Sequence, residues 1–193
     1  MNLNKEKPIL ITGGTGYIAS WIIKKLLDEG YTVHTTVRDK AKRHKYEHLA
    51  KIAQDSEGIL EIFEANLLQK DSFAEAMSDC HTVLHTASPF FIQGIKDPKK
   101  QLVDPALQGT QNVLNTVNQT ESVKRVVLTS SVAAIYGDNS DMKDSPDNVL
   151  TEYQWNTSSN PDKGTVLLLI PSHFCQFILF AEFKKSGRYR ISY

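Results

Sequence analysis

Three glycines within four residues carry the clearest chemical meaning in this chain. Gly13, Gly14 and Gly16 follow a short apolar run, and the apolar pattern of an amphipathic helix begins directly after them. A strand, a tight glycine turn and a helix bring backbone N–H groups and the positive end of a helix dipole to one place, where a pyrophosphate is stabilised. The pattern therefore predicts a dinucleotide site, and its alternative is an ordinary glycine-rich turn.

The small residues of this turn have separate predicted roles. We expect Gly13 to let the chain turn sharply and Gly14 to adopt a positive φ without a Cβ clash. Gly16 would let the backbone approach the phosphates. Ala19 stands where such turns usually carry a third glycine, and it would let the helix pack closely on the sheet.

The elements that must position this turn alternate along the chain. Short β-branched or apolar runs predict strands, and apolar residues at helical spacing predict helices. We expect strands at 9–12, 31–37, 60–63, 82–86 and 125–128, and helices at 17–29, 39–53, 72–78 and 102–117. Gly30 would end the first helix and Asp71 would cap the third. The alternation predicts an α/β fold, a Rossmann-type doubly wound parallel sheet with helices on both faces.

Ligands of such sheets bind outside the carboxyl ends of the strands, so the residues after each strand are candidates. After the second expected strand, Arg38 offers a planar guanidinium and Lys42 a second positive charge. Both suit a ribose 2′-phosphate, which favours NADPH or NADP over NAD. Asp39, however, is of the type that binds a ribose 2′-hydroxyl, and a solvated helix start is the alternative for this charged run.

The third and fourth expected strands also end in informative residues. Asn66 follows the third strand and could hydrogen-bond an adenine edge. Thr86, Ala87 and Ser88 follow the fourth strand, and their small size would let the ribose and nicotinamide end of a cofactor approach the backbone. We expect His85 to be a packed strand-end residue rather than an acid or base.

Two serines follow the fifth expected strand. A hydroxyl of Ser130 or Ser131 pointing into the cleft could hydrogen-bond a carbonyl oxygen and stabilise charge as hydride arrives. A serine pair that ends a strand is also common as plain turn chemistry, which is the alternative.

Composition narrows the classes of partner and compartment. The 193 residues contain 22 Lys or Arg and 22 Asp or Glu, so the formal net charge is zero. This balance predicts no nucleic-acid partner and no anionic membrane surface. Cys80 and Cys175 have no metal-ligand spacing, so we expect free thiols, no metal and a cytoplasmic location. Polar residues interrupt the apolar run 165–181, which favours a buried segment over a membrane span.

These motifs together resemble the extended short-chain dehydrogenase/reductase family, in the branch of dihydroflavonol, cinnamoyl-CoA and aldehyde reductases. The resemblance covers roughly residues 8–164. It rests on the segments 12–19, 36–39, 85–90, 109–114, 126–131 and 151–156.

The resemblance implies a site and a reaction. The reaction is the NADPH-dependent reduction of an aldehyde or ketone, a small-molecule carbonyl substrate, to an alcohol. Ser131 matches the family's catalytic serine. Asn66 stands where the family usually has Asp. The cofactor would be held at the pyrophosphate by Gly13, Gly14, Thr15, Gly16, Tyr17 and Ile18, at the 2′-phosphate by Arg38 and Lys42, and at the adenine by Asn66 and Leu67.

The family chemistry also needs a Tyr-x-x-x-Lys pair, which this chain lacks. We expect the pair just after Gly164, but 165–171 contain neither residue, and no other tyrosine precedes a lysine by four positions. We therefore divide the chain into an NADP-binding domain at 1–164 and an aberrant, truncated segment at 165–193. Within that segment, we expect 183–193 to be the end of a helix that leads into a sixth strand. Either a reading-frame disruption or a true loss of catalysis explains the departure.

Three functions are therefore considered for a chain without the Tyr-x-x-x-Lys pair. The first is an impaired reductase, and the main alternative is a non-catalytic NADP-binding module or regulatory protein. A nucleotide-sugar epimerase is a weaker third option, since Arg38 speaks against its usual NAD. An uncovered sheet edge and apolar surface would also favour self-association.

Overall fold

The computed structural model describes residues 5–89, 96–131, 134–137, 142–143, 147, 149–151, 154, 156 and 181–184, the last four as backbone only. These residues fall into two compact units. The first comprises the described parts of 1–89, 105–128 and 181–193, and the second those of 90–104 and 129–180. The stretch 165–180 and Cys175 lie outside the described residues, so the expectations for them stay predictions.

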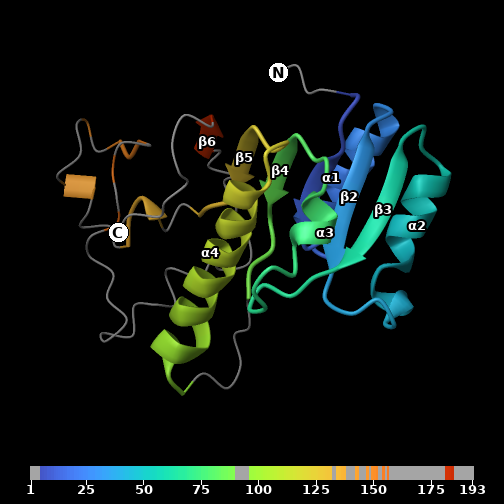
Figure 1. The fold of residues 1–193 in the computed structure, drawn as a ribbon. Helices are drawn as coiled ribbons and strands as arrows, with labels where there is room; N and C mark the ends of the chain where they lie inside the picture. Colours follow the sequence, from blue (N-terminus) through green and yellow to red (C-terminus); the bar gives the residue numbers. More distant parts are fainter. Residues whose placement is uncertain are drawn as a thin grey trace. The chain divides into compact units, whose positions relative to one another are not determined.

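The first unit is built on one sheet of the order β3-β2-β1-β4-β5-β6 (Figure 1). The strands are β1 (Ile9–Thr12), β2 (Thr32–Val37), β3 (Ile59–Glu64), β4 (Thr82–His85), β5 (Arg125–Leu128) and β6 (Ala181–Lys184). The first five run parallel, whereas β6 pairs antiparallel with β5. The order reverses direction beside β1, which confirms the predicted Rossmann-type sheet.

The helices cover both faces of the sheet. They are α1 (Tyr17–Asp28), α2 (Glu47–Gln54), α3 (Ala74–Met77) and α4 (Asp104–Gln119). A 3₁₀ turn at Arg43–Lys45 precedes α2, and a π-helical turn at Lys99–Val103 precedes α4. In Figure 1, α3 and α4 lie on the near side of the sheet.

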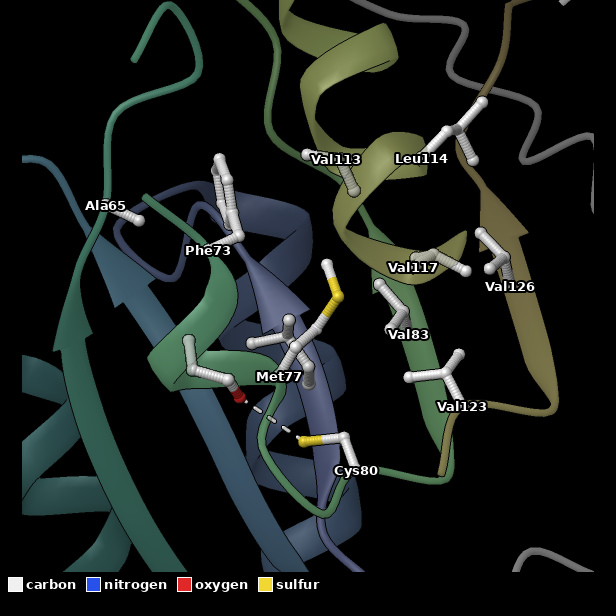
Figure 2. Packing of buried hydrophobic residues seen from close by; sticks show 12 residues of the cluster. Ala65, Phe73, Met77, Cys80, Val83, Val113, Leu114, Val117, Val123 and Val126 are labelled. Atoms are coloured by element: carbon white, nitrogen blue, oxygen red, sulfur yellow. Dashed lines mark hydrogen bonds between the residues drawn. The ribbon is translucent and has the colours of Figure 1, made fainter. Parts of the chain in front are cut away.

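Strand alternation sends neighbouring side chains to two separate cores. Ile9 and Ile11 of β1 pack with α1 and α2, in a cluster that includes Ala19, Ile23, Leu27, Val33 and Leu49. Leu10, between them, faces the opposite cluster under α3 and α4. Figure 2 shows Phe73 and Met77 beside Val83 of β4 and the α4 residues Val113 and Val117. Ala19 is thus buried against the sheet, as its small size predicted.

Replacing Phe73 with alanine will lower the free energy of unfolding by about 3–5 kcal/mol, because a large buried side chain leaves a cavity. Phe73 is 1% exposed and sits in the core beneath α4. Urea denaturation measures the loss. Leu68→Ala is the matched control, since Leu68 is 45% exposed and should lose far less. Equal losses for the two variants would contradict this packing.

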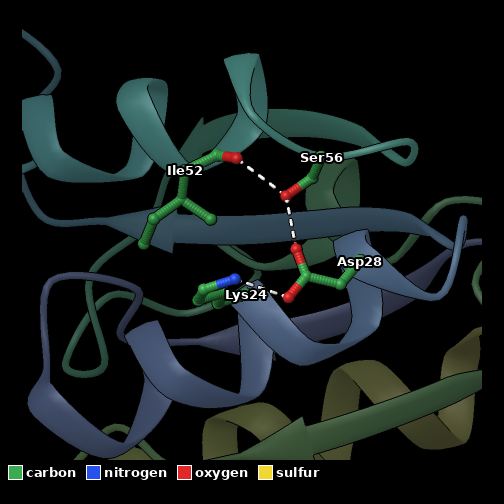
Figure 3. A network of polar contacts seen from close by, with 4 residues as sticks. All are labelled: Lys24, Asp28, Ile52 and Ser56. Carbon is green, nitrogen blue, oxygen red and sulfur yellow. Dashed lines mark hydrogen bonds and ion pairs between the residues drawn. The ribbon is translucent and has the colours of Figure 1, made fainter.

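Polar contacts join the C-terminal ends of α1 and α2 (Figure 3). Asp28 pairs with Lys24 one turn earlier, at 2.5 Å. The Ser56 hydroxyl lies 2.8 Å from an Asp28 carboxylate oxygen and 2.8 Å from the carbonyl oxygen of Ile52. The hydrogen bonds from Lys24 and Ser56 lower the pKa of Asp28. The two helices are therefore tied together at the end remote from the glycine turn.

The expected helix at 39–53 is wrong in its first half. Asp39 accepts a hydrogen bond from the N–H of Ala41 at 2.9 Å, and the Tyr46 hydroxyl donates to the carbonyl oxygen of Lys40 at 2.7 Å. Such local bonds compete with helical ones. The chain therefore forms a short turn before α2 begins at Glu47.

Three other local expectations need correction. Asp71 is not a helix cap: its φ is +59°, and α3 begins at Ala74 after Phe73. The long helix, expected at 102–117, is α4 at Asp104–Gln119. Residues 183 and 184, expected at a helix end, belong to β6, where Phe183 pairs with Val126. Gly30, with a φ of +78°, does follow the end of α1 as predicted.

Candidate functional site

Thr12 joins the carboxyl ends of β1 and β4. Its hydroxyl oxygen accepts hydrogen bonds from the N–H groups of Thr86 and Ala87, each at 3.1 Å. The Thr86 hydroxyl in turn donates to the Thr12 carbonyl oxygen at 2.5 Å. The backbone after β4 is therefore fixed against the start of the glycine turn.

The Thr12 hydroxyl donates its single proton to His85. Nδ1 of His85 lies 2.8 Å from that oxygen, which already accepts two N–H groups. A hydroxyl has one proton, so Thr12 donates it to Nδ1, and the neutral ring carries its own proton on Nε2. Burial lowers the pKa of His85 to about 4. His85 is thus the packed strand-end residue that the sequence predicted.

The low pKa of His85 should make the folded chain less stable in acid. Its pKa is lower in the folded chain than the ordinary 6.5, so the unfolded chain binds the proton first as the pH falls. Stability present above about pH 6.5 is lost progressively toward pH 4, by about 3 kcal/mol. Urea denaturation at several pH values gives the free energy of unfolding as a function of pH. Its slope should be shallower for His85→Asn than for His44→Asn, the control at an exposed histidine. Equal slopes for the two variants would contradict this account.

The glycine turn lies between β1 and α1, and its conformation differs in one respect from the prediction. The positive φ, +73°, belongs to Gly13. Gly14 is needed for space instead, because a Cβ there would overlap the hydroxyl oxygen of Thr35 on β2. Its N–H donates to the Thr36 carbonyl oxygen at 2.9 Å, and the Gly13 N–H donates to the Thr36 hydroxyl at 3.1 Å. The turn therefore packs closely against β2 and is hydrogen-bonded to it.

The N-terminus of α1 is left open to an anion. Gly16 precedes the helix, no side chain caps it, and its first turn contains no acidic residue. The first N–H groups of a helix lack intrahelical acceptors and carry partial positive charge. Thr15, Gly16 and Tyr17 are exposed, and Ile18 is half-buried. These residues form a cradle whose chemistry suits a phosphate group.

A basic segment follows β2 beside this cradle. Arg38 is exposed, whereas Lys42 pairs with Asp39 at 2.9 Å. Hydrogen bonds from Lys42 and from the Ala41 N–H lower the pKa of Asp39. Asp39 thus already has partners, and Arg38 is the exposed cation nearest to the end of the strand.

Asn66 and Leu67 follow β3. The Asn66 side-chain oxygen accepts the N–H of Leu68 at 3.0 Å. Leu67 is held by α4, since Asn112 donates its side-chain N–H to the Leu67 carbonyl oxygen at 2.7 Å. A Cβ on Gly109 of α4 would lie 3.1 Å from the Leu67 Cβ, so the helix approaches this loop closely.

The small residues after β4 border the turn itself. A Cβ on Gly13 would lie 3.0 Å from Cα and Cβ of Ala87. Thr86 and Ala87 are half-buried, and Ser88 is exposed. The structure therefore brings the residues predicted around Gly13 and Ala87 together at the carboxyl ends of β1 and β4.

The predicted catalytic serine, Ser131, belongs to the second unit. The carbonyl oxygen of Ser131 accepts the N–H of Ala134 at 2.9 Å, and the Ala134 carbonyl oxygen accepts the N–H of Asn156 at 2.9 Å. Gln154 accepts hydrogen bonds from both the N–H and the hydroxyl of Thr151. Within this unit, backbone hydrogen bonds through Ala134 thus connect Ser131 to Asn156.

Sequence reasoning missed the three threonines that fix the turn. The hydroxyls of Thr12 and Thr36 bond backbone N–H groups, and the Thr35 hydroxyl donates to the Ile11 carbonyl oxygen at 2.8 Å. Threonine is common in strands for its β-branching, which conceals this second use. Their placement at the carboxyl ends of two neighbouring strands was the available signal.

The described part of the chain has neither a metal-binding cluster nor a membrane-spanning helix. It contains no group of three or more His, Cys, Asp or Glu side chains placed to hold a metal ion. None of its helices is long and apolar enough to span a membrane. Cys80 is a free, buried thiol whose pKa is raised to about 12, chiefly by burial and further by Asp79 and Glu61.

Known proteins share this fold and much of this sequence. Cinnamoyl-CoA reductase CAD2 of Medicago truncatula is 49% identical over 132 residues, which are 68% of this chain and 40% of that protein. Anthocyanidin reductase of Arabidopsis thaliana is 44% identical over 130 residues, 67% of this chain and 37% of that protein. The crystal structure of Gre2 from Candida albicans in complex with NADPH has a TM-score of 0.66 at 31% identity, covering 84% of this chain and 49% of that one.

The chain thus spans less than half the length of these relatives. The match to cinnamoyl-CoA reductase confirms the predicted resemblance to that branch of reductases. The model of the NAD dependent epimerase/dehydratase family matches residues 9–160, which include the glycine turn, all five parallel strands and Ser131. By this match the chain belongs to the NAD dependent epimerase/dehydratase family.

Proposed function

We propose that this chain binds NADPH, with the pyrophosphate on the backbone of residues 13–18. The observation that carries the proposal is the open N-terminus of α1, uncapped and without acidic residues, beside a turn where added Cβ atoms would clash. The NADPH complex of Gre2, which has a similar fold, supports the choice of nucleotide.

Arg38 would hold the 2′-phosphate that distinguishes NADPH from NADH. Its guanidinium is exposed at the end of β2, and a planar fork of donors matches phosphate geometry. Lys42 would add a second positive charge by exchanging its contact with Asp39 for one with the phosphate. Asp39, whose carboxylate accepts the Ala41 N–H, would keep the turn in shape.

The two ends of the cofactor would lie along the neighbouring strand ends. Asn66 uses its side-chain oxygen within its own turn, which leaves its amide N–H groups to meet the adenine. Leu67, held by α4, would pack against the adenine ring. Thr86, Ala87 and Ser88 would line the path of the ribose and nicotinamide.

The reaction of the lineage would be reduction of an aldehyde or ketone to an alcohol. The bound nicotinamide supplies hydride for the carbonyl carbon. Ser131 would donate its hydroxyl hydrogen bond to the carbonyl oxygen and stabilise the charge that develops there. A tyrosine with a lysine four residues later would normally supply the proton, and these 193 residues contain no such pair. We therefore expect slow turnover by this chain.

Fluorescence titration with NADPH and NADH tests the proposed binding. The chain should bind NADPH more tightly than NADH, because only NADPH carries the phosphate that Arg38 would meet. Binding of neither dinucleotide would contradict the proposal. Tighter binding of NADH would contradict the role given to Arg38.

A non-catalytic NADPH-binding module is the second candidate, favoured by the missing Tyr-x-x-x-Lys pair. It needs the glycine turn and Arg38 but not Ser131. Oxidation of NADPH in the presence of methylglyoxal separates the two candidates. Measurable turnover that Ser131→Ala removes would favour the reductase, whereas tight binding without turnover would favour the module.

A further inference from the structure

Ser20 and His48 connect the glycine turn to α2. Ser20 lies in the first turn of α1, and its hydroxyl oxygen is 2.9 Å from the carbonyl oxygen of Gly16 and 3.2 Å from that of Gly14. His48 is the second residue of α2, and its Nε2 lies 3.0 Å from the same hydroxyl oxygen. One side-chain oxygen thus has three polar neighbours.

The number of protons available decides which groups donate and which accept in these hydrogen bonds. A serine hydroxyl has one proton, and carbonyl oxygens only accept. The Ser20 proton therefore goes to the turn, and its oxygen accepts a hydrogen bond from His48. Nε2 donates in the neutral Nε2–H tautomer and in the charged ring alike. The hydrogen bonds run from His48 through Ser20 to the carbonyl oxygens of the turn.

Holding these carbonyl oxygens orients the N–H groups of the same peptides. In a trans peptide the C=O and the following N–H point in opposite directions. With the Gly14 carbonyl drawn toward Ser20, the Thr15 N–H points away from it. The Gly16 carbonyl accepts both the Ser20 hydroxyl and the Ser20 backbone N–H, at 2.9 Å each, and orients the Tyr17 N–H in the same way. These N–H groups lie at the open start of α1, where an anion is stabilised.

We propose that His48, acting through Ser20, is a positioning residue for the pyrophosphate of the bound dinucleotide. This inference rests on the proposed NADPH binding. It differs from the roles of Arg38 and Lys42, because the pyrophosphate is common to NADPH and NADH. His48 should therefore affect both dinucleotides in the same proportion, whereas Arg38 should affect NADPH alone.

The link between Ser56 and Asp28 supplies a matched control. It joins the same two helices through a serine hydroxyl, but at the C-terminal end of α1 (Figure 3). Ser56→Ala should cost a stability comparable to that lost in Ser20→Ala. It should leave dinucleotide affinity unchanged, because the N-terminus of α1 is untouched.

The experiment compares NADPH and NADH titrations of the full chain and its variants, with thermal unfolding alongside. His48→Ala and Ser20→Ala should each weaken both dinucleotides about fivefold, the worth of one hydrogen bond. The double variant should be no weaker than either single one, since the two residues act in series. His48→Gln should recover most of the affinity, because its amide N–H can donate to Ser20.

The outcomes separate the two proposals. A wild-type chain that binds neither dinucleotide overturns both. A wild-type chain that binds NADPH, with His48→Ala binding equally well, overturns the role of His48 and leaves the proposed function standing. Failure of His48→Gln to recover affinity, or a loss confined to NADPH, also overturns it.

Discussion

Replacing Gly14 with alanine will weaken NADPH binding by about tenfold or more and lower the free energy of unfolding by about 2–3 kcal/mol. The added methyl group would overlap the hydroxyl of Thr35, which is itself fixed by its hydrogen bond to Ile11. Either β2 or the turn must move, and the N–H groups that would meet the pyrophosphate move with it. Titration calorimetry and urea denaturation measure the two effects.

Gly30→Ala is the control for this substitution. Gly30 has a φ of +78°, so alanine is strained there, but an added Cβ meets nothing within 4 Å. We expect a loss of about 1 kcal/mol in stability and no change in affinity. The double variant Gly14→Ala with Thr35→Ala should recover part of the binding, since the nearest Thr35 atom left is Cβ, at 3.2 Å. Full NADPH affinity in Gly14→Ala alone would contradict a pyrophosphate site at this turn.

Replacing Arg38 with alanine will weaken NADPH binding by about tenfold to a hundredfold and leave NADH binding nearly unchanged. The reason is the loss of charged hydrogen bonds to the 2′-phosphate, which NADH lacks. Parallel fluorescence titrations of the two dinucleotides give the ratio directly.

Lys25→Ala is the control for net charge. Lys25 is an exposed cation in the last turn of α1, at the end remote from the cradle. Its loss should leave the preference between the dinucleotides unchanged. If Arg38→Ala and Lys25→Ala weaken NADPH equally, the effect is long-range electrostatics, and the assignment of Arg38 to the 2′-phosphate is wrong.

The sheet could be predicted from the sequence because its strands are short apolar runs with clear boundaries. β1 and β5 have the predicted bounds, since Pro8 and Gly13 border the first and polar residues border the second. The region after β2 could not be predicted in this way. There Asp39 and Tyr46 make local hydrogen bonds that override helix propensity, and such bonds depend on side-chain geometry.

The candidate site, like the fold, could be predicted from the sequence only in part. Glycine spacing predicted where the turn lies, because the need for space and positive φ leaves a trace in residue type. It did not predict which glycine has which role, since Gly13 and Gly14 differ only in what surrounds them. The hydrogen bonds of Thr12, Ser20 and His48 join segments far apart in the sequence, so only the fold reveals them.

The most direct test of the central claim is an amide NMR titration of the full chain with NADPH. If the pyrophosphate binds the start of α1, the N–H resonances of 14–18 should shift most. The matched addition of NADH should shift the same resonances but leave that of Arg38 nearly unmoved. Binding that leaves the resonances of 14–18 in place would contradict the account.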